Sequence, residues 1–185
     1  MEELLIEVAG AGDIEAAISV QHRAFERVAR WLGLEDASGL APVSETVADV
    51  ERLVADAGMV VLVARLSIAG SASDAGVSAG RQVPRTRVVG TVRGALGDDG
   101  CVEIGRLAVD DGFEGRGVGR ELMVAIEARF PDRDRFVLFT GKEAEGPIRL
   151  YESLGYVIRD EEEFRPGMFL VWMEKCRGRR VDSTA

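Results

Sequence analysis

The fold of this chain follows from the stretch Val109-Asp110-Asp111-Gly112-Phe113-Glu114-Gly115-Arg116-Gly117-Val118-Gly119-Arg120-Glu121-Leu122-Met123. An apolar, strand-like run enters it from Val102 and stops at the two aspartates. Three glycines then alternate with other residues, and beyond them apolar side chains recur at helical spacing: Val118, Leu122, Ile126 and Phe130. The order is therefore strand, glycine loop, helix.

This order predicts an anion site. Glycine permits positive φ angles and lets another group approach the backbone closely. The first amides of a helix have no partner within the helix and point outward, which suits a phosphate. Arg116 and Arg120 would add positive charge beside Gly115, Gly117 and Gly119. The alternative interpretation is a tight strand-to-helix turn without a ligand.

Two common phosphate motifs do not fit this stretch. A P-loop requires Lys-Ser or Lys-Thr after the glycines, where Arg120-Glu121 stands. A dinucleotide fold prefers G-x-G-x-x-G and an acid about 20 residues further on that ends a second strand, and the stretch does not fit that pattern.

Two blocks resemble the GNAT N-acetyltransferase superfamily. Residues 114–119, Glu-Gly-Arg-Gly-Val-Gly, are similar to its Q/R-x-x-G-x-G/A signature, and Leu107-Ala108-Val109 stands where the family's central strand ends. Residues 148–156, Ile-Arg-Leu-Tyr-Glu-Ser-Leu-Gly-Tyr, resemble the family's LYExxGF helix and strand. The resemblance extends over residues 88–175. Glu114 departs from the Gln or Arg of the signature, and we expect its side chain not to touch the phosphates.

The composition is that of a single soluble globular domain: 185 residues, 46% hydrophobic and 30% charged. A net charge of −9 argues against nucleic acid as a partner and favours a cationic amine. No apolar run approaches the roughly 20 residues that span a bilayer, so no membrane association is expected. The acidic start Glu2-Glu3 is unlike a signal peptide, and a cytoplasmic location is the expectation.

The two cysteines, Cys101 and Cys176, lie in apolar segments far apart in the sequence, and we expect buried free thiols. One histidine and two separated cysteines make no ligand cluster, so neither a disulfide nor a metal site is predicted.

Hydrophobic periodicity predicts strands over residues 4–8, 59–66, 85–96, 101–109, 135–140, 156–159 and 168–174, and helices over 13–28, 44–57, 117–130 and 147–154. An acidic turn is expected at 160–163, a flexible hairpin loop at 68–84 and a tail at 176–185. This order predicts an α+β fold, a single domain over residues 1–185, with a mixed, mostly antiparallel central sheet of about seven strands flanked by about four helices.

The resemblance implies that coenzyme A binds at Gly115–Arg120, Val118 included, and that its pantetheine arm runs along the strand edge at Leu107, Ala108 and Val109. In this family the central strand splays from its neighbour there. A backbone N–H near Val109 would then stabilise the oxyanion formed when an amine attacks the thioester.

Two side chains are candidates for proton transfer. Glu103 is an acid in an apolar strand, and period-two geometry would place it on the same face as Val109; it is the candidate base, the alternative being an ion pair with Arg106 or Arg93. Tyr151 matches the family's tyrosine, which implies the acid that protonates the thiolate; the alternative is packing on the sheet.

The first helix offers residues for an acceptor pocket, although core packing is the alternative. Phe25, Trp31 and Leu32 are its large apolar residues, and His22 is interpreted as structural or surface-exposed.

The resemblance implies an N-acetyltransferase that uses acetyl-CoA as co-substrate, without a metal, and transfers acetyl to a primary amine by direct attack in a ternary complex. The acceptor is either a small molecule or a protein amine, and a homodimer is compatible with the sequence. The alternative is a non-catalytic acyl-CoA sensor or interaction module.

Overall fold

The computed structural model describes residues 3–31, 34, 40–55, 59–68 and 85–178. They form one seven-stranded sheet in the order β1-β2-β3-β4-β5-β7-β6. The strands are β1 (Leu4–Val8), β2 (Val60–Ile68), β3 (Arg85–Leu96), β4 (Val102–Val109), β5 (Arg135–Gly141), β6 (Val157–Arg165) and β7 (Met168–Cys176). Only β4 and β5 pair in parallel. The predicted α+β class and mostly antiparallel sheet are confirmed.

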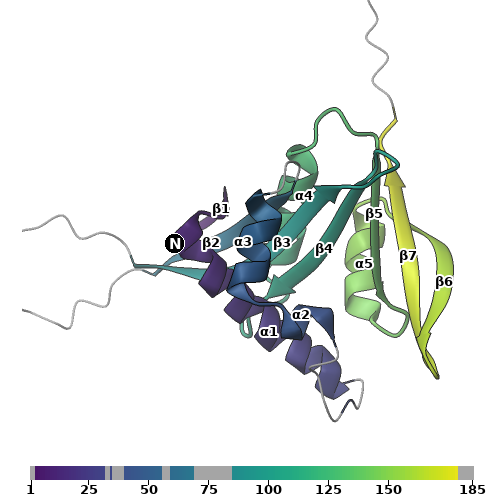
Figure 1. Ribbon diagram of the computed structural model, residues 1–185, viewed down its shortest axis with the longest axis horizontal. Helices are drawn as coiled ribbons and strands as arrows, with labels where there is room; N and C mark the ends of the chain where they lie inside the picture. Colours follow the sequence, from purple (N-terminus) through teal and green to yellow (C-terminus); the bar gives the residue numbers. More distant parts are fainter. Residues whose placement is uncertain (1–2, 32–33, 35–39, 56–58, 69–84, 179–185) are drawn as a thin grey trace, which may run out of the picture.

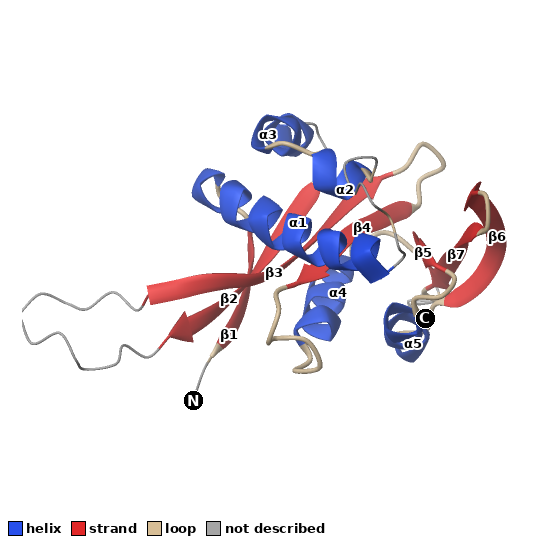
Figure 2. Cartoon of the chain, turned by 90° about the horizontal axis from the view of Figure 1, so that it is seen from below, coloured by secondary structure: helices blue, strands red, loops and turns tan. Residues whose placement is uncertain are grey.

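Five α-helices occur in the described residues: α1 (Ile14–Trp31), α2 (Ala41–Ser44), α3 (Val47–Ala55), α4 (Val118–Ala128) and α5 (Glu145–Ser153), with a 3₁₀ turn at Ala11–Asp13. The prediction was about four helices; the additional one is α2, a single turn that the sequence analysis did not predict. Figure 2 shows α1, α2 and α3 on one face of the sheet and α4 and α5 on the other.

A separate apolar cluster fills each side of the sheet. The α4 side holds Val102, Ile104, Leu122, Ile126 and Phe136 among others, and the α1 side holds Ile14, Val20, Val63 and Ala108. Helix α4 packs closely on β3, where a Cβ at Gly90 would lie 2.9 Å from Leu122 Cδ1 and 3.2 Å from the Ala108 carbonyl oxygen. The absence of a side chain at Gly90 therefore sets the distance between this helix and the sheet.

Strands β4 and β5 separate soon after they meet. They pair at only two positions, Val102 with Phe136 and Glu103 with Val137, whereas β5 pairs with β7 along its whole length. Figure 1 shows the two strands together at one end and well apart at the other. Within the described residues, the backbone edge of β4 beyond Glu103 thus has no strand partner on the β5 side, in line with what the family resemblance implies.

A β-bulge interrupts the alternation of side chains in β4. Arg93 pairs with Gly105 but Thr91 pairs with Ala108, so β4 has one extra residue here, and Arg106 takes a φ of +56°. Before the bulge Val102 and Ile104 face α4; after it Leu107 and Val109 face α4. Glu103 therefore faces the α1 side, opposite to the side chain of Val109, and the predicted shared face was wrong because a bulge shifts the period by one residue.

Two further predictions need correction, and two lie outside the described residues. The expected acidic turn at 160–163 belongs to β6, which pairs with β7 through Asp160–Glu163. Cys176 is exposed rather than buried, while Cys101 is buried, and both are free thiols. The predicted loop falls on residues 69–84 and most of the predicted tail on 179–185, which the structure does not describe. No helix in the described part of the chain is long and apolar enough to cross a membrane.

Candidate active site

The glycine loop forms an open cradle at the start of α4. Gly115 and Gly117 have φ angles of +71° and +85°, and no heavy atom lies within 4 Å of a Cβ built on either. Gly117 is the N-cap, and the first helical bond runs from the Glu121 amide to the Gly117 carbonyl. The amides of the first turn therefore remain available to an anion in the adjoining space.

Glu114, the residue that departs from the family signature, is held by an arginine of α1. The Arg27 guanidinium donates a hydrogen bond to Glu114 and another, of 3.2 Å, to the Val109 carbonyl oxygen, and it lies 3.2 Å from the Asp111 carboxylate. The expectation that Glu114 avoids the phosphate site is consistent with this pairing. Arg27 was not identified from the sequence, because its partners lie more than 80 residues away.

The two arginines of the loop make specific contacts. The Arg116 guanidinium lies 5.3 Å from the centroid of the Phe113 ring. Arg120 donates a 2.9 Å hydrogen bond to the Ser153 hydroxyl and so joins α4 to α5. Both side chains belong to exposed residues next to the cradle, where their charge favours a phosphate.

Asp110 anchors the loop where β4 ends. It is 2% exposed, its amide donates to the Val89 carbonyl, and its carboxylate accepts a 3.0 Å bond from Arg23 and another from Arg87. Burial opposes ionisation, but the bonds from these two arginines hold the pKa of Asp110 below its usual range. The start of the loop is therefore fixed to both α1 and β3.

The edge of β4, the start of α4 and α5 converge. A Cβ at Gly119 would lie 3.4 Å from Leu150, 3.8 Å from Val109 and 3.9 Å from Leu107. Leu107 and Val109 pack on the α4 side, and Ala108 is buried on the opposite side. The predicted residues of strand, loop and helix thus line one region, between the separated strands.

Tyr151 extends from α5 into the same apolar cluster. It is 8% exposed, its ring meets that of Tyr156 edge-on with centroids 6.0 Å apart, and burial raises its pKa to about 12. Its hydroxyl has no hydrogen bond with any described residue. At neutral pH it is a protonated donor. Tyr156, by contrast, donates to Glu127 at 3.0 Å inside the core.

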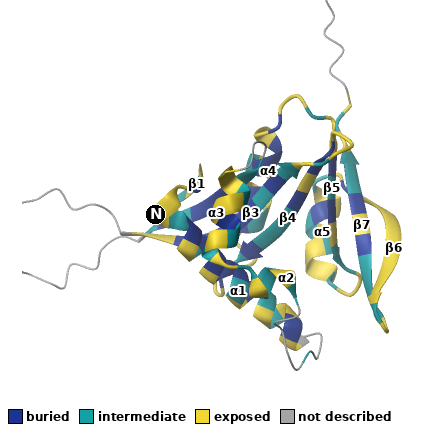
Figure 3. Ribbon diagram, viewed as in Figure 1, coloured by how far each residue is buried: buried dark blue, intermediate teal, exposed yellow. Residues whose placement is uncertain are grey.

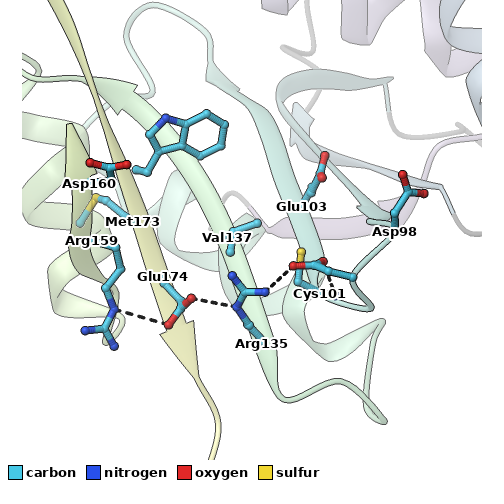
Figure 4. A pocket seen from close by; sticks show the side chains of 11 residues that line it. Asp98, Cys101, Glu103, Arg135, Val137, Arg159, Asp160, Met173 and Glu174 are labelled. Carbon is cyan, nitrogen blue, oxygen red and sulfur yellow. Dashed lines mark hydrogen bonds and ion pairs between the residues drawn. The ribbon is translucent and has the colours of Figure 1, made fainter. Parts of the chain in front are cut away.

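Glu103 lies at the last position where β4 pairs with β5, and the two strands separate beyond it. It is exposed and lines a pocket of about 450 Å³ on the α1 side of the sheet. Figure 4 shows this pocket, in which Arg135 bridges Glu174 and Asp99. Other acids in its lining are Asp98 and Asp160. Glu103 and Tyr151 therefore lie on opposite faces of the sheet.

A polar cluster lies beside α1 that the sequence did not reveal. The Glu45 carboxylate, 10% exposed, lies 2.8 Å from Arg93 and 3.6 Å from Arg106, and accepts a 2.9 Å bond from Gln21. His22 bonds to the Glu45 backbone oxygen at 2.9 Å, in line with the structural interpretation. Phe25 packs partly buried on the α1-side cluster. The Trp31 side chain and Leu32 lie outside the described residues.

Comparison with known proteins finds one family model that matches part of the chain. Residues 75–156 match the model of the acetyltransferase (GNAT) family. No curated protein matches the chain.

Solved structures share the fold at low sequence identity. The PaiA N-acetyltransferase from Thermoplasma acidophilum, in complex with coenzyme A, has a TM-score of 0.68 and 14% identity, with 94% of this chain and 99% of that chain covered. The ribosomal-protein-S18-alanine N-acetyltransferase from Escherichia coli has a TM-score of 0.65 and 14% identity, with 99% of each chain covered. The acetyltransferase YncA from Salmonella typhimurium, with its cofactor acetyl-CoA, has a TM-score of 0.63 and 19% identity, also with 99% of each covered.

Proposed function

We propose that this chain is a GNAT acetyltransferase that transfers an acetyl group from acetyl-CoA to a primary amine by direct attack in a ternary complex; the partial match to the family model and the shared fold support this. The observation that carries the proposal is the open cradle at Gly115 and Gly117, which leads onto the unpaired edge of β4. A helix N-terminus suits the pyrophosphate, and the strand edge suits an amide-containing pantetheine arm.

Acetyl-CoA, when bound, supplies the thioester. The backbone of β4 near Leu107 and Val109 orients it and donates an N–H towards the developing oxyanion. Glu103 accepts the proton of the amine, directly or through a water, because an alkyl ammonium has a pKa near about 10.4 and must first lose a proton. Tyr151 holds the proton that the thiolate requires, since its raised pKa keeps it neutral.

The acceptor is an amine, either small or on a protein. One structural relative is named for the alanine of a ribosomal protein, which makes a peptide N-terminus a reasonable member of the test panel. The acids around Glu103 favour a cationic amine over a neutral nucleophile.

Replacing Gly117 with glutamate tests the cofactor site. A side chain there is strained and fills the cradle with negative charge, so acetyl-CoA affinity measured by calorimetry should fall at least about a hundredfold, as for the loss of several charge-assisted bonds. Gly167→Glu is the matched control, because Gly167 has a φ of +77° and no heavy atom within 4 Å of a Cβ, but lies in the β6–β7 turn.

Turnover is measured as free thiol released from acetyl-CoA with a broad set of amines. The proposal fails if folded Gly117→Glu binds acetyl-CoA as tightly as the parent. Tight binding by the parent with no amine-dependent thiol release would instead favour the non-catalytic sensor.

A further inference from the structure

The cluster of Arg93, Arg106 and Glu45 has two positive charges and only one negative charge. Two guanidinium groups, Arg93 on β3 and Arg106 at the β4 bulge, face one carboxylate, so the net charge is +1 with His22 neutral. All three side chains are largely buried, with 15%, 19% and 10% exposed for Arg93, Arg106 and Glu45. We propose that Arg93 and Arg106 bind a carboxylate of the acceptor. This rests on the proposed function and deepens it by naming the acceptor class.

The hydrogen bonds of the cluster are incomplete in a way that calls for another anion. Arg93 Nη1 and Arg106 Nε are buried and have no hydrogen-bond partner among the described residues, the latter because its 3.6 Å distance to Glu45 is too long. Glu45 also accepts a bond from Gln21, and its single negative charge balances only one of the two arginines. Burial, and then the charge of Arg93, lower the pKa of Arg106. A second carboxylate would neutralise the excess charge and accept from the guanidinium groups.

The cluster lies next to the candidate base. Arg93 pairs with Gly105, and no heavy atom is found within 4 Å of a Cβ built on Gly105. Glu103 lies two residues before Gly105 on the same face, which places their Cα atoms about 7 Å apart at about 3.4 Å per residue. The open space at Gly105 therefore connects the carboxylate that would accept the proton of the amine with the two arginines.

Charge changes sign along this path. The pocket at Glu103 is rich in acids, among them Asp98 and Asp160, whereas the other end has Arg93 and Arg106. An acceptor with a cationic amine at one end and a carboxylate at the other matches both ends. The acceptors that fit are amino acids and peptides with an acidic group a few bonds from the amine.

Paired acceptors test this assignment. Each ω-amino acid from β-alanine to 6-aminohexanoate is compared with its neutral carboxamide, and a short peptide with aspartate at its second position is compared with the asparagine peptide. The parent should favour the acid of its best pair by about tenfold or more in kcat/KM, as expected for a charge-assisted contact. Amino acids and peptides form separate arms, so the source of the carboxylate is resolved.

Arg93→Gln and Arg106→Asn should abolish the preference for the acid, so that within each variant kcat/KM for the acid and for its carboxamide agree within about threefold. Asparagine is chosen because it tolerates the positive φ at position 106. Arg65→Gln is the matched control and should keep the preference, since Arg65, on β2, is 19% exposed and ion-paired to Asp13 and Glu7.

Binding without turnover gives an independent readout. The preferred acid should shift nuclear magnetic resonances of the parent in a saturable titration, and the shift should be lost in Arg93→Gln. Equal kcat/KM for every acid and carboxamide pair, or an unchanged preference in both folded variants, overturns the inference and leaves the acetyltransferase activity standing. Failure to acetylate any amine overturns the proposed function, while the titration still decides whether a carboxylate binds.

Discussion

The surroundings of Tyr151 and Glu103 suit the two residues to opposite roles in proton transfer. Tyr151 is buried among apolar side chains, which favours the neutral phenol and raises its pKa to about 12. Glu103 is exposed among other acids, at the point where β4 and β5 separate. The tyrosine can therefore donate, and the glutamate can accept, at the same pH.

Tyr151→Phe keeps the ring and its packing, so stability and acetyl-CoA affinity should hold while kcat falls by about 10²–10⁴-fold. A folded-state pKa of about 12 keeps Tyr151 protonated throughout the working range, so its ionisation should produce no decline in parent activity below pH 10. The deficit of the variant should shrink at high pH, where thiolate leaves without a proton. Stopped-flow measurement of thiol release at pH 6–10 gives both results.

The matched comparison is Glu103→Gln. Its kcat should recover with rising pH, because the amine then loses its proton without a base. Parent-level turnover by Tyr151→Phe, with chemistry shown to be rate-limiting, would exclude the tyrosine as the acid.

At the scale of elements, the end of β4 is held by Asp110. Its carboxylate joins Arg23 of α1 and Arg87 of β3, and its pKa is lowered because these bonds outweigh the burial that opposes them. A lowered folded-state pKa means that the unfolded chain binds the proton more tightly. The stabilisation is therefore present above the unfolded pKa of about 3.9 and is lost as pH falls through the folded value.

Asp110→Asn should cost about 1–3 kcal/mol in the free energy of unfolding at pH 7, the range for charge-assisted bonds to arginines that remain partly hydrated. The difference from the parent should narrow below pH 4, where the parent carboxylate becomes protonated. Urea unfolding at several pH values measures this, with the exposed Asp132→Asn as control. A deficit that stays constant down to pH 2 would mean that Asp110 acts by packing and not by charge.

Sequence periodicity predicts most helices and strands of this chain, and it fails where pairing between the backbones of neighbouring strands determines the structure. Residues 160–163 are four consecutive acids, a pattern typical of a turn, yet they form part of the edge strand β6 because their backbone pairs with β7. Charge on an edge strand also prevents pairing with other chains. The bulge at Arg106 has no sequence signal either, since arginine seldom adopts a positive φ and a glycine would have been the expected marker.

For the candidate site, local motifs were informative and long-range clusters were not. The cradle and Tyr151 follow from short stretches in which glycines and the helical block stand together. Four residues come together only because α1 and the link between α2 and α3 lie against β3 and β4: Gln21, Glu45, Arg93 and Arg106. The spacing of these four residues in the sequence does not indicate that they are in contact, because only the fold brings them together.

Over the whole molecule, the sheet consists of two parts with a weak seam. β1–β4 lie between helices on both faces, whereas β5, β7 and β6 join them through two residue pairs between β4 and β5, the apolar cluster on the α4 side and contacts such as Lys175 to Glu127 at 2.6 Å. Figure 3 shows β6 exposed along its length at the outer edge. The proposed binding path for acetyl-CoA follows this seam.

Acetyl-CoA bound along the seam should stabilise the whole fold. A ligand that binds only the folded chain adds about 2.7 kcal/mol at a concentration of 100 Kd. For a chain of this size that corresponds to a rise in Tm of about 5–11 °C, at about 2–4 °C per kcal/mol. Differential scanning fluorimetry over an acetyl-CoA series measures the rise, which Gly117→Glu should lose and Gly167→Glu should keep.

Because the seam is the weakly paired part of the sheet, hydrogen exchange should slow most at residues 104–109 and 115–120. Protection confined to the β6–β7 turn would mean that acetyl-CoA binds elsewhere. An unchanged Tm at saturating acetyl-CoA would mean that it does not bind the folded chain.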